Sequence, residues 1–163
     1  MKMREPVKVR FATPQDIDFI YDSLVELVKE SRLEKRFSQT KNSLFRMIFL
    51  NDSAVEVLIG QAGNNPVGLA LFSMTNRNFM LFNGPGIYLH DLFVNERYRR
   101  MGIATALINQ LKKIARERQC SRIDWVLLTD NKEGKEFYKS LQCAEPVEYI
   151  QYMRINHDEL GLL

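Results

Sequence analysis

The chain has 163 residues, of which 45% are hydrophobic and 26% charged, with a formal net charge of +3 at pH 7. This length is enough to bury one hydrophobic core and leaves no room for a second sizeable domain, so we expect a single domain over residues 1–163. Because the 23 basic residues are interspersed with 20 acidic ones, the small positive excess does not indicate a partner nucleic acid.

The two cysteines, Cys120 and Cys143, are too few and too far apart for a disulfide framework, a redox pair or a zinc site. No apolar run reaches the roughly 18 residues of a membrane span, and the N-terminus lacks the hydrophobic stretch of a signal peptide. We therefore expect a cytoplasmic protein that holds no metal and does not bind a membrane.

In chain order, the first predicted element is a strand over residues 7–11. Thr13 and Pro14 are typical of a helix start, and this helix should extend to about Lys29. The charged stretch 30–36 predicts a break, and a short helix should follow Thr40.

The middle of the chain predicts strands joined by turns. The apolar runs 55–61 and 67–74 flank a turn-forming segment, 62–66, and so predict a hairpin. The runs 79–82 and 87–94 flank a second turn, after which come a helix from Ile103, a strand at 123–129, a short helix through Tyr138 and a last strand at 148–155. This alternation predicts an α/β protein with a mixed sheet.

Residues 87–115 are the most informative segment. A strand over 87–94 leads through a basic turn into an amphipathic helix, on which Ile103, Leu107, Leu111 and Ile114 recur at helical spacing. The first amides of such a helix have no intrahelical acceptor, and two arginines stand just before it, so the turn favours an anion such as a pyrophosphate. Taken alone, residues 99–104 also fit a polar turn before an ordinary helix. The strand before them and the helix after them favour the anion site.

Neither the glycine pattern of a nucleotide-hydrolysing P-loop nor that of a dinucleotide-binding turn occurs in the sequence. Instead, Arg99, Gly102 and Ala104, spaced Arg-x-x-Gly-x-Ala after Leu92-Phe93-Val94, resemble the acetyl-CoA signature of the Gcn5-related N-acetyltransferases (GNAT). Downstream, the segment from Asn131 to Tyr138 resembles that family's Asn-x-x-Ala-x-x-Phe-Tyr pattern, with Gly134 where alanine is usual.

The sequence resembles one branch of that family more narrowly. Residues 9–13 with Asp16, then Glu26-Leu27 and residues 84–94, resemble the spermidine/spermine (diamine) N-acetyltransferases. The resemblance covers nearly the whole chain. It implies an acyl-CoA N-acyltransferase fold, in which helices flank a central mixed sheet that is mostly antiparallel and whose parallel strands, 87–94 and 123–129, splay apart.

The resemblance also implies acetyl-CoA as co-substrate. Backbone groups of the strand would hold its pantetheine, the turn and helix start would hold its pyrophosphate, and the segment after the next strand would form the far wall. The implied residues are Leu92, Phe93, Val94, Arg99, Arg100, Met101, Gly102, Ile103, Ala104, Thr105, Asn131 and Gly134. Asn131 is equally well explained as the cap of the helix that follows it.

Two residues are candidates for proton transfer. Tyr138 stands at the position of the family's general-acid tyrosine. Spacing alone favours an aromatic pair with Phe137 that packs the helix on the sheet, and only the resemblance favours the general acid. His90 stands where the diamine branch usually carries glutamate, and we weigh a general base equally against a hydrogen-bonded strand histidine. A neutral imidazole attracts a polycation less than a carboxylate does, so this difference puts polyamine specificity in question.

The predicted acceptor-binding residues are the acidic groups near these positions and His90 itself. Asp91 also fits a buried carboxylate satisfied by backbone amides, and Glu30 also fits a solvated helix charge. The full set is Glu30, His90, Asp91 and Glu148. A second departure from the family pattern is Gln142, which occupies a position where glycine is general.

These observations predict an N-acetyltransferase that moves acetyl from acetyl-CoA to a primary amine of a small molecule, such as a polyamine, a diamine or a lysine-like amino acid. Direct attack is favoured because Cys143 has no histidine nearby in sequence to activate it. The alternatives are a protein N-acetyltransferase and a non-catalytic acyl-CoA-binding module. The branch resemblance also implies a homodimer, with the C-terminal strands as contact.

Overall fold

The structure, a computed structural model, describes residues 6–50 and 54–156. The chain divides into two compact units, Met1–Leu128 and Thr129–Leu163. The first unit contains the sheet and most of the helices, and the second contains one helix. Whether the two together behave as one domain stays a prediction.

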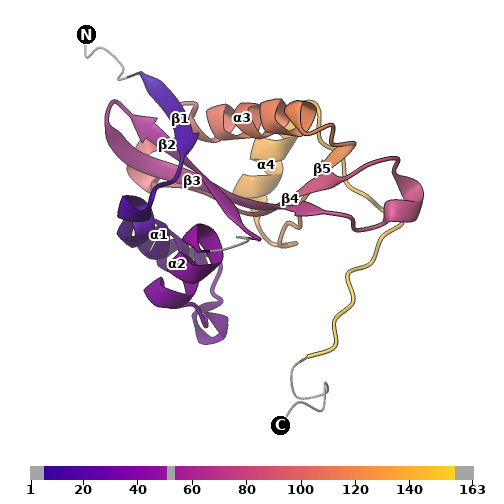
Figure 1. The fold of residues 1–163 in the computed structure, drawn as a ribbon, viewed down its shortest axis with the longest axis horizontal. Helices are drawn as coiled ribbons and strands as arrows, with labels where there is room; N and C mark the ends of the chain where they lie inside the picture. Colours follow the sequence, from indigo (N-terminus) through magenta and orange to yellow (C-terminus); the bar gives the residue numbers. More distant parts are fainter. Residues whose placement is uncertain (1–5, 51–53, 157–163) are drawn as a thin grey trace. The chain divides into compact units, whose positions relative to one another are not determined.

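The first unit is built on a five-stranded mixed sheet (Figure 1). Its strands, in spatial as well as chain order, are β1 (Val7–Phe11), β2 (Glu56–Ala62), β3 (Asn65–Thr75), β4 (Gly86–Val94) and β5 (Arg122–Asp124). The first four strands pair antiparallel, and β5 pairs parallel to β4. The predicted mixed, mostly antiparallel sheet is therefore confirmed.

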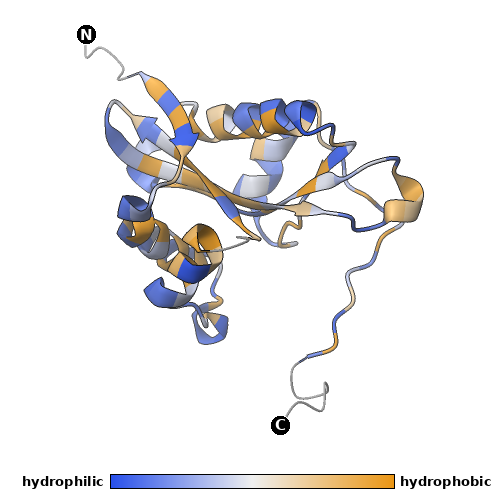
Figure 2. Cartoon of the chain, viewed as in Figure 1, coloured by the Kyte–Doolittle hydropathy of each residue, from blue (hydrophilic) through white to orange (hydrophobic). Residues whose placement is uncertain are grey.

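Helices cover both faces of this sheet (Figure 1). On one face, α1 (Ile17–Glu30) and α2 (Lys41–Phe49) contribute Ile20, Leu24, Leu44 and Ile48 to a buried cluster with residues of β2, β3 and β4. On the other face, α3 (Ile103–Glu117) buries its apolar stripe. Figure 2 shows the apolar residues of β3 and β4 running through the middle of the sheet.

The helix starts follow the predicted chemistry. Thr40 Oγ1 accepts a hydrogen bond from the Ser43 amide at 3.0 Å and caps α2. Before α1, a 3-10 turn begins at Pro14, and Asp16 Oδ2 accepts from the Thr13 amide at 2.7 Å. Asp16 also pairs with Arg10 at 2.7 Å, and this guanidinium lowers the pKa of the Asp16 carboxyl.

Two predicted strands of the first unit are wrong in kind or length. Residues 79–82 are not a strand, because Asn78 adopts a left-handed conformation and a 3-10 turn, Phe79–Leu81, follows it with its side chains exposed. The strand predicted at 123–129 keeps sheet pairing only through Asp124. Its apolar residues Val126 and Leu128 are 58% and 42% exposed, so beyond that point they do not contribute to the core.

The second unit contains α4 (Lys132–Ser140), as predicted. The strand predicted at 148–155 is absent from the described part of this unit, where residues 143–156 form no helix or strand. Strand-like composition is insufficient there, because a strand is stable only when a neighbouring strand satisfies its backbone groups.

Candidate active site

The site begins at the outer edge of β4. The parallel pairing with β5 covers only Gly86, Ile87 and Tyr88, while β4 itself continues for six more residues to Val94. Within the described residues, the edge of β4 from Leu89 onward therefore has no strand beside it. Its outward backbone N–H and C=O groups can pair with an extended ligand, which is the arrangement predicted for the pantetheine at Leu92, Phe93 and Val94.

The turn after β4 presents backbone donors. Asn95 Oδ1 accepts from the Arg97 amide at 3.1 Å, and a 3-10 turn leads to Arg99. Arg100 and Gly102 then adopt left-handed conformations, with φ of 62° and 87°. Gly102 is exposed, and a Cβ built on it would meet nothing within 4 Å. The turn therefore leaves the amides that begin α3 exposed, and the anion site at residues 99–105 stays a prediction with which this conformation is compatible.

The start of α3 sits in a notch made by two glycines. Gly60 and Gly68 face each other across β2 and β3. A Cβ on Gly60 would lie 2.7 Å from Ile103 Cγ2, and one on Gly68 would lie 2.8 Å from the Phe93 carbonyl oxygen and 3.0 Å from the same Ile103 methyl. Because neither glycine has a side chain, Ile103 packs directly on the sheet, and the first turn of α3 lies close beside the end of β4.

Arg99 is held from two sides. Its Nε donates to the Val94 carbonyl at 2.9 Å, and its guanidinium pairs with Glu30 Oε1 at 2.5 Å. Glu30, predicted as an acceptor contact, thus lies at the end of α1 against the turn that follows β4. The carboxylate fixes the direction of the Arg99 side chain and partly offsets its charge.

His90 occupies an irregularity in β4. Leu71 pairs with Asp91 and the next residue of β3, Phe72, pairs with Leu89, so His90 is the extra residue of a β-bulge. A bulge re-aims a side chain. Here the imidazole Nε2 lies 2.8 Å from Ser73 Oγ of β3.

This imidazole belongs to an exposed residue and has Tyr88 beside it, with Arg77 on the Tyr88 ring. The Tyr88 ring meets it edge-on, with 4.9 Å between ring centroids. Arg77, on the connection between β3 and β4, lies over the Tyr88 ring, with its Cζ 4.5 Å from the ring centroid. Burial and the charge of Arg77 lower the pKa of His90 below its ordinary value of 6.5. The imidazole is therefore neutral, and able to accept a proton, at neutral pH.

Asp91 follows His90 on the strand and is half-buried. Burial raises the pKa of its carboxyl. Among the described residues no hydrogen bond or ion pair is found for this carboxylate, so the backbone amides suggested by the sequence do not satisfy it. A carboxylate in this state gains from an ammonium ligand.

The second unit carries the remaining predicted residues. Asn131 Oδ1 accepts a hydrogen bond from the Gly134 amide at 2.8 Å and caps α4. This is the capping role that the sequence suggested for Asn131 beside cofactor binding. Tyr138 is half-buried and its ring lies 5.1 Å from that of Phe137. Glu148 is exposed. Gln142 adopts φ of 54°, a left-handed conformation that glycine takes more readily than glutamine.

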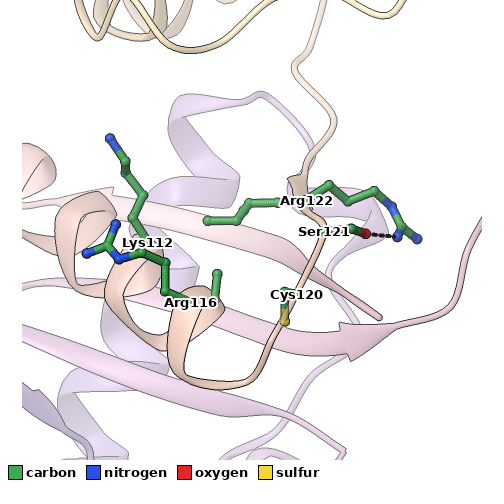
Figure 3. Close-up of a pocket in the computed structure, with 7 residues that line it drawn as sticks. Lys112, Arg116, Cys120, Ser121 and Arg122 are labelled. Carbon is green, nitrogen blue, oxygen red and sulfur yellow. Dashed lines mark hydrogen bonds between the residues drawn. The ribbon is translucent and has the colours of Figure 1, made fainter. Parts of the chain in front are cut away.

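A separate hollow lies at the far end of α3 (Figure 3). In Figure 3 the charged ends of Lys112 and Arg116 lie to one side of Cys120, while Arg122 extends to the other toward Ser121. Burial raises the pKa of the Cys120 thiol, which disfavours the reactive thiolate. The charged groups of this hollow therefore do not converge, and its thiol is disfavoured as a nucleophile. It is lined by Lys112, Ala115, Arg116, Cys120, Ser121, Arg122 and Ile123.

Residues 6–50 and 54–156 contain no group of three or more His, Cys, Asp or Glu side chains placed to hold a metal ion. No helix among them is both long and apolar enough to cross a membrane.

Sequence reasoning missed Ser73 and Arg77. Both lie 13 or more residues from His90, and only the pairing of β3 with β4 brings them to it. A serine near a strand end and an arginine in a polar turn give no sequence signal of their own.

Comparison with known proteins establishes the family. Residues 18–142 match the acetyltransferase (GNAT) family, and the chain belongs to it. It is an N-acetyltransferase, and the family uses acetyl-CoA as co-substrate. The open edge of β4 and the bared helix start fit that ligand.

Individual relatives agree. The chain is 26% identical over 129 residues to the thialysine N-epsilon-acetyltransferase of Caenorhabditis elegans, covering 79% of this chain and 78% of that protein. It is 24% identical over 162 residues to a human spermidine/spermine N(1)-acetyltransferase-like protein 1, covering 94% of this chain and 23% of that protein. A solved ribosomal-protein-alanine N-acetyltransferase from Brucella melitensis shares the fold, with a TM-score of 0.72, 20% identity and coverage of 93% of this chain and all of that one.

Proposed function

We propose that this enzyme acetylates a primary amine of a small molecule, a diamine or polyamine or a lysine-like amino acid, by direct attack. The observation that carries the proposal is the arrangement around β4. Among the described residues, the edge of this strand after Tyr88 has no partner strand, and the start of α3 follows it, which together suit acetyl-CoA. The same strand carries a neutral imidazole whose direction is set by a bulge. The names of the thialysine and spermidine/spermine relatives support a small-molecule amine.

Acetyl-CoA supplies an acetyl group activated as a thioester. The β4 edge would hold its pantetheine, and the amides of residues 102–105 with Arg99 and Arg100 would hold its pyrophosphate. Asn131 and Gly134 are proposed for the far wall. Asp91, and more remotely Glu30 and Glu148, are proposed for the ammonium groups of the acceptor.

His90 is proposed to accept the proton that makes the amine nucleophilic. An alkyl ammonium has an ordinary pKa of about 10.4, so only about one molecule in a thousand is neutral at pH 7. When Nε2–H donates to Ser73 Oγ, the lone pair of Nδ1 is left to take the proton. Tyr138 is proposed to protonate the departing thiolate. A nitrogen–carbon bond forms and the carbon–sulfur bond breaks. The new amide nitrogen loses its second proton to water, and Tyr138 recovers from water the proton that it gave to the thiolate, so protons and charges balance.

The test is an assay of released CoA thiol from acetyl-CoA with a panel of spermidine, putrescine, lysine, thialysine and a basic peptide, beside a reaction without amine. Rapid release with one small amine is expected. Release only with the peptide would favour a protein acetyltransferase, and silence across the panel with CoA bound would favour a binding module. Tyr138→Phe should slow turnover about 100-fold or more and leave CoA affinity unchanged.

The homodimer implied by the branch resemblance is also kept as a proposal. Light scattering at micromolar concentration should give twice the mass of the chain, and a monomer mass would contradict it.

A further inference from the structure

We propose that Arg77 selects the acceptor by binding a carboxylate on it, so that the preferred substrates are amino acids with a terminal side-chain amine rather than polyamines. The inference rests on the proposed function and names the substrate class of that same site. Three features of Arg77 support it: the anchored backbone, the distance of the guanidinium from His90, and the uncompensated positive charge.

The backbone of Arg77 is fixed at both of its polar groups. Its amide donates to Thr75 Oγ1 at 3.0 Å, and its carbonyl accepts from the guanidinium of Arg122. Arg122 is itself anchored, because its Nε donates to Asp124 Oδ2 at 3.0 Å and its guanidinium lies 4.1 Å from the centre of the Phe82 ring. The connection between β3 and β4 is thus tied to the start of β5, and Arg77 projects from a defined position.

The side chain of Arg77 lies over the ring of Tyr88, which in turn meets the imidazole of His90. Its Cζ lies 4.5 Å from the Tyr88 ring centroid, and the His90 ring lies 4.9 Å from that same centroid on the adjoining part of β4. The Cζ atom of Arg77 is therefore at most 9.4 Å from the centre of the His90 ring. After burial, the charge of Arg77 is the second cause that lowers the pKa of His90, so its field reaches the imidazole.

The charge of Arg77 is not balanced by a neighbour. Arg122 pairs with Asp124, and Arg99 pairs with Glu30. For Arg77, which is exposed, the described residues provide no carboxylate partner. An exposed, uncompensated cation beside an acceptor site attracts anions and repels polycations.

The chemistry of an amino acid matches this arrangement. Lysine carries its reactive amine at one end and a carboxylate at the other, and a planar guanidinium binds a carboxylate through two parallel hydrogen bonds. Cadaverine is the same carbon chain without the carboxylate. The two compounds therefore isolate the contribution of Arg77, and ornithine and putrescine form a second such pair.

The experiment measures kcat/KM for lysine and cadaverine, and for ornithine and putrescine, with the wild-type enzyme, Arg77→Ala and Arg77→Lys. The wild type should prefer each amino acid. Arg77→Ala should lose roughly 10- to 100-fold in kcat/KM for the amino acids, mainly through KM, while the diamines hold or improve. Arg77→Lys, which keeps the charge without the planar fork, should be intermediate.

Three controls sharpen the result. Arg116→Ala removes one exposed arginine from α3 and should leave both ratios unchanged. Lysinamide, which lacks the negative charge at nearly the same size, should react with the wild type no better than with Arg77→Ala. Unfolding temperatures of all variants should agree within a few degrees, which shows that the loop keeps its structure.

The outcomes separate the two proposals. Acetylation of diamines with no dependence of the lysine-to-cadaverine ratio on Arg77 would overturn this inference and leave the proposed function intact. Absence of turnover with every small amine would overturn both. A loss at Arg77→Ala that is equal for lysine and cadaverine would show that Arg77 serves catalysis or structure rather than selection.

Discussion

The two halves of β4 present groups of different kinds. Its C-terminal half and the turn into α3 offer backbone groups, exposed because β5 ends early and because Gly102 adopts a left-handed conformation. Its N-terminal half offers side chains, with His90 aimed by a bulge, Ser73 and Tyr88 in contact with its imidazole, and Arg77 over the Tyr88 ring. The backbone half follows the pattern of the family, whereas the side-chain half departs from the diamine branch at His90.

This difference teaches how substrate choice can change while co-substrate binding stays. Backbone donors do not change with most substitutions, so the acetyl-CoA half tolerates many sequences as long as the turn is preserved. A side-chain site changes with a single codon. Substitutions in the two halves should therefore separate cleanly in kinetics.

The largest effect is expected from the side-chain half. His90→Asn removes the proposed base and should lower kcat/KM for the amine about 100-fold or more at saturating acetyl-CoA. The dissociation constant of acetyl-CoA, measured by calorimetry, should stay within twofold. Ser73→Ala is the milder companion, since it leaves the imidazole and removes its hydrogen bond. A His90→Asn enzyme with full activity would restrict His90 to a structural part in the strand.

The next effect is expected from the backbone half. Gly102→Val places a branched side chain at φ of 87° in the turn proposed to hold the pyrophosphate, and should weaken acetyl-CoA binding at least about tenfold. Gly63→Val pairs with it as a control, because Gly63 has φ of 60° in the turn between β2 and β3. The control should be destabilised to a similar degree yet bind acetyl-CoA normally. Equal loss of affinity in both variants would mean that the turn after β4 contributes nothing of its own.

A smaller effect concerns pH. Because burial and Arg77 lower the pKa of His90, protonation of the base and the resulting acidic limb of kcat/KM should lie below pH 6.5. Arg77→Gln removes a positive charge, so the pKa of His90 should rise and the limb should move to higher pH. The other charged groups on the packed strands are Asp91 and the Asp124–Arg122 pair, and both remain. A limb that stays in place would remove His90 as the titrating group.

The smallest effect is expected at the far end of α3, which belongs to neither half. Gln119 adopts φ of 55° after the helix, and the next amide, of Cys120, donates back to Ala115 O at 2.8 Å. Glycine takes this conformation without strain, so Gln119→Gly should raise the free energy of unfolding by about 1 kcal/mol. Gln110→Gly, inside the same helix, should lower it by about as much. Chemical denaturation measures both, and equal signs would contradict the reasoning.

The sequence predicts the elements whose signals are local. The strand 86–94, the amphipathic α3 and the helices after Thr13 and Thr40 follow from periodicity and caps. The strands predicted at 79–82 and 148–155 fail because an apolar run does not specify a partner strand. The same limit applies to the site. Arg99 and Gly102 are close in sequence, so a sequence motif reveals them. Ser73 and Arg77 come near His90 only because β3 pairs with β4.

The glycine notch beneath α3 has a consequence for anyone who maps this enzyme by mutation. Gly60 lies on β2 and Gly68 on β3, so neither belongs to β4. The packing of Ile103 on the sheet nevertheless depends on both glycines. An added methyl group on either must displace the start of α3, and with it the amides proposed for the pyrophosphate. A comprehensive mutational scan would therefore show a loss of activity at Gly60 and Gly68 like that expected for residues proposed to bind acetyl-CoA, although these two glycines act only through the position of α3.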